Sequence, residues 1–455
     1  PRSTSYPSSL LSPMFTHLPS IQPSQLYKPS DSVQSLRRKL LRGANVLIVQ
    51  GGYSGKKFVY QKLKDLGVSI TILDGPDSPW KFAAEQGLID DFCALDFTDH
   101  VTVFERAMEL IFALEQSFDA VTTYFEDAVP LAARIATALG LQNNPIQACD
   151  RARNKSMTRQ VMKESGLVVP KFYRVRSESD LNDACDHVGF PAVLKPVFGA
   201  ASMGVTKVFD KQGTKESYEK IMSTLDVKND TIWAQGTEMV LEEYYDGDEF
   251  DVDLLLFEGS VVYSKVIDNW ATCEPFFQES GVNCPSLYPE KKQMEMVQLA
   301  VDSTLALGFK YGAFHVELKY TSKGARLIEV NARMGGVSVY DCHLTAWGID
   351  LVEEHMMAVL KIPICPKIPE NPLAYFAESA INAPYSGVMK SDTWLDAVLS
   401  DARVRSVTYF SKKGEKVVGP EDGVPTWIAE IRVVDAFSGD AALGFIRDLM
   451  MNKVT

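Results

Sequence analysis

The hydrophobic and polar positions along the chain first describe buried strands joined by an amphipathic helix. Residues 45–52, NVLIVQGG, form a continuous apolar run that ends in glycines. Residues 56–67, KKFVYQKLKDLG, have helical spacing, and a second apolar run, VSITILDGP, occupies residues 68–76. Such a pattern is typical of a βαβ unit on a parallel sheet. We therefore predict an α/β domain over residues 43–150.

The regions outside residues 43–365 have weaker patterns. The first 30 residues are rich in Ser and Pro and are followed by a short amphipathic helix, so we expect residues 1–42 to form a tail and a helix that ends at Gly43. Residues 366–455 mix short strands, RVRSVTYF and TWIAEIRVVDA, with a final helix, DAALGFIRDLMM. We predict a small C-terminal α+β cap there.

Composition and charge restrict the partners. The net charge of −13 and the pI near 5.1 argue against nucleic acid or a membrane surface, and no apolar run approaches the length of a membrane span. The seven cysteines are scattered and lack CxxC spacing, which favours reduced thiols in a cytoplasmic protein. The acid-free N-terminal tail leaves organelle targeting open.

The turn QGGYSGKKF, residues 50–58, lacks the spacing of a phosphate-binding motif. Lys57 stands where a P-loop needs Ser or Thr, and G-x-G-x-x-G is absent, although Asp74 lies where a ribose-binding acid would be. We interpret it as a glycine turn in a Rossmann-like scaffold. Binding of a small ligand at the carboxyl ends of the strands is the alternative.

Residues 189–205, GFPAVLKPVFGAASMGV, carry Lys195 from an apolar strand into a loop of small residues. Such a loop brings backbone N–H groups close to phosphate oxygens, and a lysine on a strand supplies a fixed positive charge. This favours a nucleoside triphosphate over a flexible hairpin. In MVLEEYYDGDEFDVDLLL, residues 239–256, Glu249, Asp251 and Asp253 share one face of a strand. That face is open to solvent or lines a cleft that accepts a ribose.

Residues 314–320, FHVELKY, and 326–336, RLIEVNARMGG, are predicted strands joined by the polar turn TSKGA, so we expect a β-hairpin. Strict alternation places Leu327 on the face that also holds the polar side chains, which are His315, Glu317, Lys319, Glu329, Asn331 and Arg333.

Glu317 and Glu329 can then lie close together beside the amide of Asn331. Two half-buried carboxylates repel each other unless a cation lies between them, and hard oxygen ligands suit Mg²⁺. Arg333 can hold an anion or a developing oxyanion. An exposed face with cross-strand ion pairs is the alternative.

Four features, in this order, resemble those of an ATP-grasp ligase over residues 45–365. They are Lys155, the Lys195 loop, the hinge VLEEYYDGDEF and the hairpin HVELK...RLIEVNARMGG. The hairpin is most similar to carnosine synthase and the bacterial L-amino acid (dipeptide) ligases. The resemblance implies an ATP-grasp fold in which residues 151–365 form the catalytic domain after a Rossmann-like pre-grasp domain. The continuation MGGVSVYDCHL after Arg333 departs from carnosine synthase, which leaves β-alanine and histidine in doubt as substrates.

The resemblance also implies residue roles. ATP phosphates would be bound by Lys155, Lys195 and the loop residues Gly199, Ser202, Met203 and Gly204. Adenine would lie against the backbone of Glu242, Glu243, Tyr244 and Tyr245, and the ribose against Glu249. Two Mg²⁺ ions, for which Mn²⁺ can substitute, would be bound by Glu317, Glu329 and Asn331. The catalytic residues would be Arg333, which stabilises the acyl phosphate and the tetrahedral adduct, and Glu329.

The implied reaction joins a small-molecule carboxylate and an amine, both amino-acid-like, through an acyl phosphate, releasing ADP and phosphate. Residues 268–289 fall where such ligases build an amino-acid pocket, and Glu279 either pairs with a substrate ammonium or is an exposed loop acid. The other candidate substrate residues are His315, Gly335, Gly336, Val337, Tyr340 and Asp341. The family also suggests a homodimer.

Two alternatives stay open. The first is an ATP-grasp ligase whose carboxylate or amine is not an amino acid, including a carboxylase or a purine-pathway ligase. The second is a nucleotide-binding regulatory module without turnover, which would not need all of the predicted metal ligands. We expect His315 and His343 to be structural or to orient a substrate rather than to act as general bases.

Overall fold

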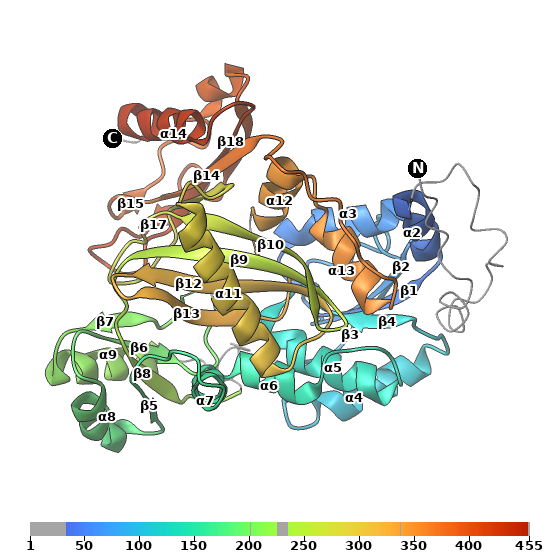
Figure 1. The fold of residues 1–455 in the computed structure, drawn as a ribbon, viewed down its shortest axis with the longest axis horizontal. Helices are drawn as coiled ribbons and strands as arrows, with labels where there is room; N and C mark the ends of the chain where they lie inside the picture. Colours follow the sequence, from blue (N-terminus) through green and yellow to red (C-terminus); the bar gives the residue numbers. More distant parts are fainter. Residues whose placement is uncertain (1–32, 201, 225–234, 337, 454–455) are drawn as a thin grey trace.

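A computed structural model describes residues 33–200, 202–224, 235–336 and 338–453 (Figure 1). The predicted Ser/Pro-rich tail, Ala201 of the small-residue loop and the substrate candidate Val337 lie outside these residues. Among the described residues, no helix is long and apolar enough to cross a membrane. The proposed domain boundaries at residues 42, 150 and 365 stay predictions.

The N-terminal region is the predicted parallel α/β unit. Its four strands lie in the order β3-β2-β1-β4 and pair in parallel: β1 (Asn45–Val49), β2 (Ser69–Asp74), β3 (Asp91–Ala94) and β4 (Ala120–Thr122). Both faces of the central strand β1 are buried, as its continuous apolar run predicts. The helices of this region are α2 (Val33–Leu41), α3 (Lys57–Asp65), α4 (Val103–Ala113) and α5 (Val129–Ala138).

A small antiparallel sheet follows in the chain and lies at the lower left of Figure 1. Two helices, α6 (Ile146–Arg153) and α7 (Lys155–Glu164), lead into it. The strand order is β5-β8-β6-β7, with β5 (Phe172–Val175), β6 (Ala192–Pro196), β7 (Thr206–Val208) and β8 (Met239–Glu243). The helices α8 (Leu181–Val188) and α9 (Lys211–Thr224) complete this layer, whose apolar core is separate from that of the N-terminal region.

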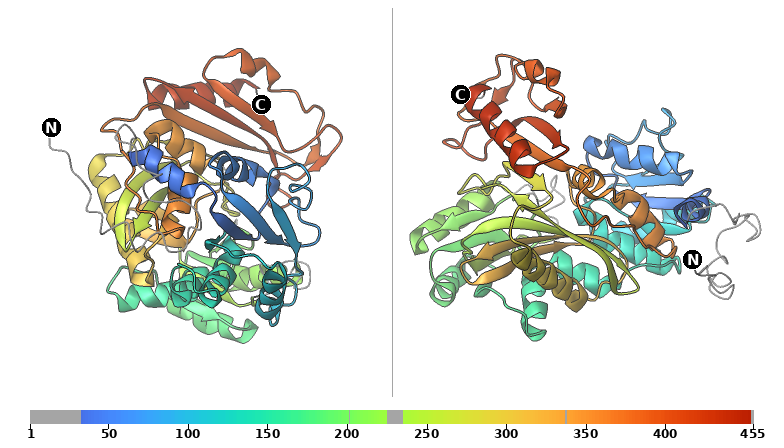
Figure 2. Two further views of the ribbon diagram at one scale, coloured as in Figure 1. Left: turned by 90° about the vertical axis from the view of Figure 1, so that its right-hand side faces the viewer. Right: turned by 45° about the horizontal axis from the view of Figure 1, so that its top comes forward.

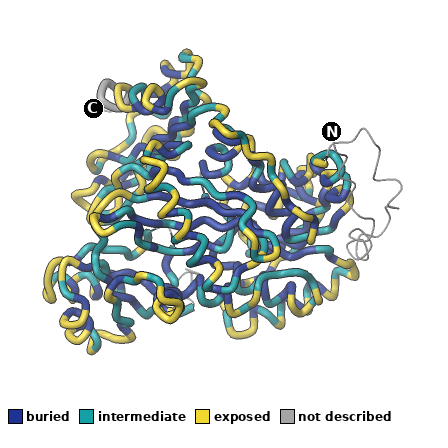
Figure 3. The backbone as a smooth tube through the Cα atoms, viewed as in Figure 1, coloured by how far each residue is buried: buried dark blue, intermediate teal, exposed yellow. Residues whose placement is uncertain are grey.

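An eight-stranded sheet, in the order β13-β12-β9-β10-β11-β14-β18-β16, forms the centre of the molecule. Its strands are β9 (Asp248–Phe257), β10 (Ser260–Asn269), β11 (Gly281–Cys284), β12 (Gly312–Thr321), β13 (Gly324–Asn331), β14 (Tyr375–Asn382), β16 (Val404–Tyr409) and β18 (Trp427–Asp435). The helix α11 (Glu290–Leu307) covers one face, and Figure 3 shows the buried strands beneath it. The other helices are α12 (Val339–Trp347), α13 (Leu351–Val359) and α14 (Gly439–Lys453).

The C-terminal residues share this central sheet. Strand β14 pairs with β11, and β18 and β16 extend the sheet beyond β14. The predicted C-terminal cap is therefore continuous with the central sheet (Figure 2). The strands β15 (Gly387–Val388) and β17 (Lys416–Val417) form a separate two-stranded ladder. The cap therefore lies directly beside the segment 270–280, which joins β10 to β11.

The predicted hairpin is β12–β13, and its register places Glu317 opposite Glu329 and His315 opposite Asn331. A bulge interrupts the ladder after Glu317, so that Leu318 pairs with Leu327. Strict alternation is therefore wrong at Leu327, which packs in the core beneath α11, whereas Ile328 lies on the opposite side.

Candidate functional site

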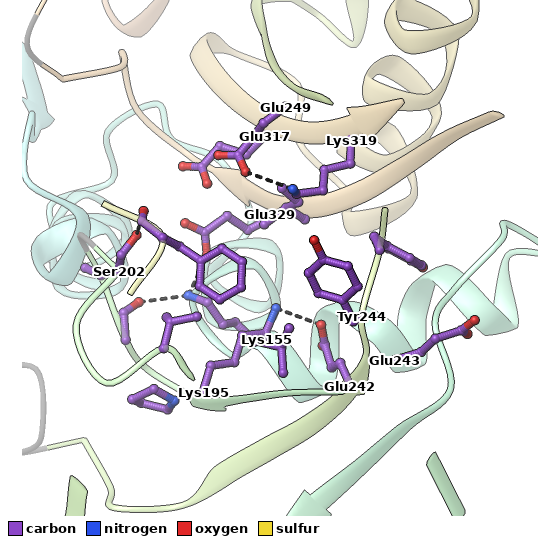
Figure 4. A pocket seen from close by; sticks show the side chains of 18 of the residues that line it. Lys155, Lys195, Ser202, Glu242, Glu243, Tyr244, Glu249, Glu317, Lys319 and Glu329 are labelled. Atoms are coloured by element: carbon purple, nitrogen blue, oxygen red, sulfur yellow. Dashed lines mark hydrogen bonds and ion pairs between the residues drawn. The ribbon is translucent and has the colours of Figure 1, made fainter. Parts of the chain in front are cut away.

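A cavity lies between the small antiparallel sheet and the hairpin β12–β13 (Figure 4). We call it the central cavity. Of the residues predicted to contact ATP, metal or substrate, twelve line it: Lys155, Lys195, Gly199, Ser202, Glu242, Glu243, Tyr244, Tyr245, Glu249, Glu279, Glu317 and Glu329. The sequence motifs, which are far apart in the chain, therefore converge on one site.

Two lysines enter the central cavity beside the small-residue loop. Lys155 is the first residue of α7, and its ammonium lies 2.8 Å from the carbonyl oxygen of Gly199 and 2.5 Å from a carboxylate oxygen of Glu329. Lys195 projects from β6 and is buried. Gly204 has φ of +70°, and a Cβ there would lie 3.0 Å from Pro196, so this position favours glycine. The arrangement provides positive charge and a loop of small residues for a polyanion.

Glu242 is the centre of a buried ion-pair network. Its carboxylate is 2.9 Å from Nε of Arg159 and 2.7 Å from Nζ of Lys195. Burial alone would raise the pKa of Glu242, but these two cations outweigh it and hold the pKa at about 2. Burial lowers the pKa of Lys195, and Glu242 opposes this effect. Glu242 thus holds Lys195 in place at the central cavity.

The hinge after β8 is tied to the segment 270–280. The hydroxyl of Tyr244 donates to Glu274 at 2.8 Å, and Lys207 pairs with the same carboxylate at 2.8 Å while lying 3.7 Å from the centre of the Tyr244 ring. Ser202 donates a 3.2 Å hydrogen bond to the carbonyl oxygen of Phe277. The 270–280 segment therefore contacts both the hinge and the small-residue loop.

Glu317 and Glu329 form the candidate metal site. Burial and the charge of Glu329 raise the pKa of Glu317 well above its ordinary value. Burial would also raise the pKa of Glu329, but Lys155 outweighs it and holds that pKa at about 2. Two adjacent, half-buried carboxylates repel each other unless a cation lies close to both of them. Their chemistry therefore fits Mg²⁺.

Asn331 completes this set from the end of β13. Its amide nitrogen donates to Glu317 at 3.1 Å and to Glu329 at 3.4 Å, and a rotation of the amide would present its oxygen to a cation instead. Across the part of the chain that the structure describes, no three His, Cys, Asp or Glu side chains are grouped as a metal site. Mg²⁺ needs no such group, because it is bound through one or two carboxylates together with substrate phosphates.

A buried network lies beside Glu317 and includes His315 of the same strand and Asp253 of the neighbouring strand β9. His315 Nδ1 lies 2.9 Å from Asp253, and His343 Nε2 lies 2.7 Å from the other oxygen of the same carboxylate. Burial would lower the pKa of His315, but Asp251 and Asp253 outweigh it and raise that pKa to about 10. The face that carries Glu249, Asp251 and Asp253 is thus turned inward. Both histidines contact the carboxylate of Asp253, and their structural or substrate-orienting role stays a prediction.

Arg333 lies just beyond the end of β13 and reaches the N-terminal region. Its Nε is 2.8 Å from Glu126, and its guanidinium also lies 3.4 Å from the side-chain oxygen of Asn331. Glu279 lines the central cavity and is exposed, so its two predicted roles, a partner for a substrate ammonium and an exposed loop acid, both stay open.

Several predicted residues do not line the central cavity. Met203 is exposed, and Tyr340 stacks on Phe58 and donates to Asp350, so both lie apart from it. Asp341 pairs with Arg432 of β18 instead of lining a pocket. Six other predicted residues lie near the residues of the central cavity without lining the cavity: Asn331, Arg333, His315, Gly204, Gly335 and Gly336.

The structure adds lining residues to which the sequence motifs assigned no individual role. Arg159 is buried and donates to the carbonyl oxygen of Ile328 at 2.7 Å as well as to Glu242. Its position four residues after Lys155, on the same face of α7, was the available signal. Ile328 enters through the bulge, which no local pattern indicates. The other added residues are Val193, Pro196, Ala200, Val205, Phe277 and Lys319.

The fold and the site define a class of protein. Residues 188–341 match the ATP-grasp domain family, and residues 60–142 match the ATP-grasp N-terminal domain family. A crystal structure of an L-amino acid ligase from Bacillus licheniformis superposes with a TM-score of 0.76 at 23% identity, over 90% of this chain and 98% of that one. The chain belongs to the ATP-grasp superfamily, and the predicted fold is confirmed.

Among the relatives, carnosine synthase 1 of Homo sapiens is 33% identical over 353 residues, which cover 74% of this chain and 42% of that protein. Alanine–anticapsin ligase of Bacillus subtilis (strain 168) is 26% identical over 271 residues, covering 56% of this chain and 57% of that protein. The matched region thus spans less than two thirds of the length of either relative.

Proposed function

We propose that this chain is an ATP- and Mg²⁺-dependent carboxylate–amine ligase that joins two amino-acid-like substrates. One observation carries the proposal: a single cavity collects two lysines beside a small-residue loop and two opposed carboxylates of the β12–β13 hairpin. Those groups are what binding and neutralising a triphosphate requires. The names of two relatives, alanine–anticapsin ligase and L-amino acid ligase, favour amino-acid-like substrates.

The reaction takes place in two steps. An oxygen of the first substrate's carboxylate attacks the γ-phosphorus of ATP, the bond to ADP breaks, and an acyl phosphate forms. The nitrogen of the amine then attacks the acyl carbon, loses its proton, and phosphate leaves. Lys155 and Lys195 would hold the phosphates, and Arg333 would stabilise the oxyanion of the adduct.

The residues on the hairpin would hold the metal. Mg²⁺ bound by Glu317, Glu329 and Asn331 would supply neutralisation of the phosphate charge. The small-residue loop, already in contact with Phe277 through Ser202, would exclude water from the acyl phosphate. A second Mg²⁺ ion, substitution by Mn²⁺, adenine at residues 242–245, ribose at Glu249 and a homodimer stay predictions of the resemblance.

The test is ADP and phosphate release with ATP and Mg²⁺ across amino acids offered singly and in pairs, with the product identified by its mass. We expect release that needs both an acid and an amine and that gives an amide, and Glu329→Ala should abolish it. Release without an amide product, or release independent of the second substrate, would overturn the proposal. If the protein binds ATP but no pair of amino acids gives turnover, the result would instead favour the alternative of a nucleotide-binding regulatory module.

A further inference from the structure

Lys56 is a buried lysine that the proposed mechanism does not use. It ends the short 3₁₀ turn Ser54–Lys56 after β1 and is 3% exposed. Its ammonium makes one long hydrogen bond, 3.4 Å, to the carbonyl oxygen of Gly335. Within the described ranges, no carboxylate forms an ion pair with it. A buried ammonium without an anion is costly, so a binding partner is expected.

The charged groups beside Lys56 leave an excess of positive charge. Burial and then the charge of Arg333 lower the pKa of Lys56 to about 7. Glu126 does not neutralise Lys56, because its carboxylate is engaged with Nε of Arg333 at 2.8 Å. Lys56 thus lies beside the charge of Arg333 and has no carboxylate partner among the described residues. An anion bound there would relieve both the desolvation of Lys56 and its repulsion by Arg333.

The protein on both sides of Lys56 is firmly packed. In the turn that carries it, the indole nitrogen of Trp80 donates to Gly52 at 2.7 Å, and the hydroxyl of Tyr60 donates to Gly51 at 2.6 Å. On the hairpin side, a Cβ on Gly335 would lie 2.7 Å from His315. The turn also stands at the carboxyl edge of the parallel sheet, where such sheets bind ligands. Lys56 is therefore held in place beside the Arg333 end of the site.

We propose that Lys56 and Arg333 form an anion site that binds the free carboxylate of the amine substrate. The inference rests on the proposed ligase function. When two amino acids are joined, the carboxylate of the first is consumed, whereas the amine substrate keeps its own carboxylate throughout. That group needs a cation at the end of the site away from the ATP phosphates, and Lys56 is a buried cation that the phosphate-binding set leaves unused.

The test compares Lys56→Met with Lys57→Met, because Lys57 is the exposed neighbour. Met keeps most of the length of the side chain and removes an unpaired buried charge, so Lys56→Met is expected to fold. With an active substrate pair, Lys56→Met should raise the KM of the amine substrate by about 10- to 100-fold and leave the KM of ATP and of the acyl donor unchanged. Lys57→Met should match the wild type.

A substrate analogue identifies the group that Lys56 recognises. The wild type should prefer an amino acid as the amine substrate over its C-terminal amide, and Lys56→Met should lose that preference while Lys56→Arg retains part of it. An unchanged preference in Lys56→Met, or an equal rise in the KM of ATP, would overturn the proposal. The second outcome would indicate a phosphate site instead.

A binding measurement separates this inference from the proposed function. If the wild type forms no amide with any pair, the ligase proposal fails. Lys56 is then tested by thermal unfolding with each amino acid and with its amide. A stabilisation given by the acid and not by the amide, lost in Lys56→Met and kept in Lys57→Met, supports the anion site. The absence of any acid-specific shift in the wild type, or the same shift in both variants, overturns it.

Discussion

Glu317 and Glu329 lie directly opposite each other on the antiparallel strands β12 and β13. Side chains in such a pair are close enough to interact, and like charges placed there are destabilising. The raised pKa of Glu317, caused by burial and by Glu329, expresses this repulsion. The pair therefore places two carboxyl groups on one face of the hairpin at a cost in stability.

The first prediction concerns this pair. Glu317→Gln should keep or raise the melting temperature measured without metal, because it removes the repulsion, yet lower kcat by at least about 100-fold through loss of a metal ligand. Thermal unfolding and ADP release titrated with Mg²⁺ measure the two effects. Glu258→Gln, at an exposed position after β9, is the control. A variant that is both active and unchanged in its Mg²⁺ requirement would contradict the metal assignment.

The second prediction concerns Lys195. In Lys195→Met, Glu242 keeps Arg159 as a partner at 2.9 Å, so the fold should be retained while a charge facing the ATP phosphates is lost. We expect ATP binding to weaken by about 10- to 100-fold, as measured by calorimetry. Lys211→Met removes an exposed lysine that pairs with Asp186 and should bind ATP normally. Equal affinity in both variants would remove Lys195 from the phosphate site.

Sequence patterns within a single strand or hairpin were sufficient to predict much of this site. The apolar runs predicted the parallel sheet, and the turn TSKGA fixed the pairing that sets Glu317 opposite Glu329. The bulge at Ile328 was missed, because period-two alternation assumes an uninterrupted ladder. The helical spacing of Arg159 from Lys155 was a local signal, but Arg159 belongs to none of the motifs.

Contacts between distant segments were beyond any local pattern. Arg333 meets Glu126, and Lys56 meets Gly335, across more than 200 residues of sequence. The pairing of β11 with β14, which brings the C-terminal strands into the central sheet, is of the same kind. Such contacts depend on how the sheets dock against each other. The periodicity of a single sequence does not indicate that docking.

The third prediction concerns Glu279 and rests on the proposed function. Its carbonyl oxygen accepts a 2.9 Å hydrogen bond from Asn382 of β14, so the C-terminal strands position it at the cavity. Glu279→Gln should raise the KM of an amino-acid acyl donor by about 10-fold or more, because the carboxylate would pair with its ammonium. An acyl donor without the amino group serves as the control, since its KM should not change. An equal effect on both donors would place Glu279 outside the ammonium site.

The fourth prediction concerns the stability that Glu242 provides. Glu242→Gln leaves Arg159 and Lys195 buried without their shared anion and should lower the free energy of unfolding at pH 7 by about 3 kcal/mol or more. Urea unfolding measures the loss. Glu243→Gln changes the adjacent, partly exposed carboxylate and should have little effect. Similar losses in the two variants would show that the ion-pair network does not stabilise the fold.

The pH dependence gives an independent check on the same residue. The pKa of Glu242 is held at about 2, below its ordinary value of 4.5, which corresponds to about 3 kcal/mol. Because this carboxyl has a lower pKa in the folded state, its contribution is present above about pH 4.5 and is lost as the pH falls toward 2. The difference in unfolding free energy between the wild type and Glu242→Gln should therefore shrink between pH 5 and pH 2. A difference that stays constant over that range would mean that the charge of Glu242 is not what stabilises the protein.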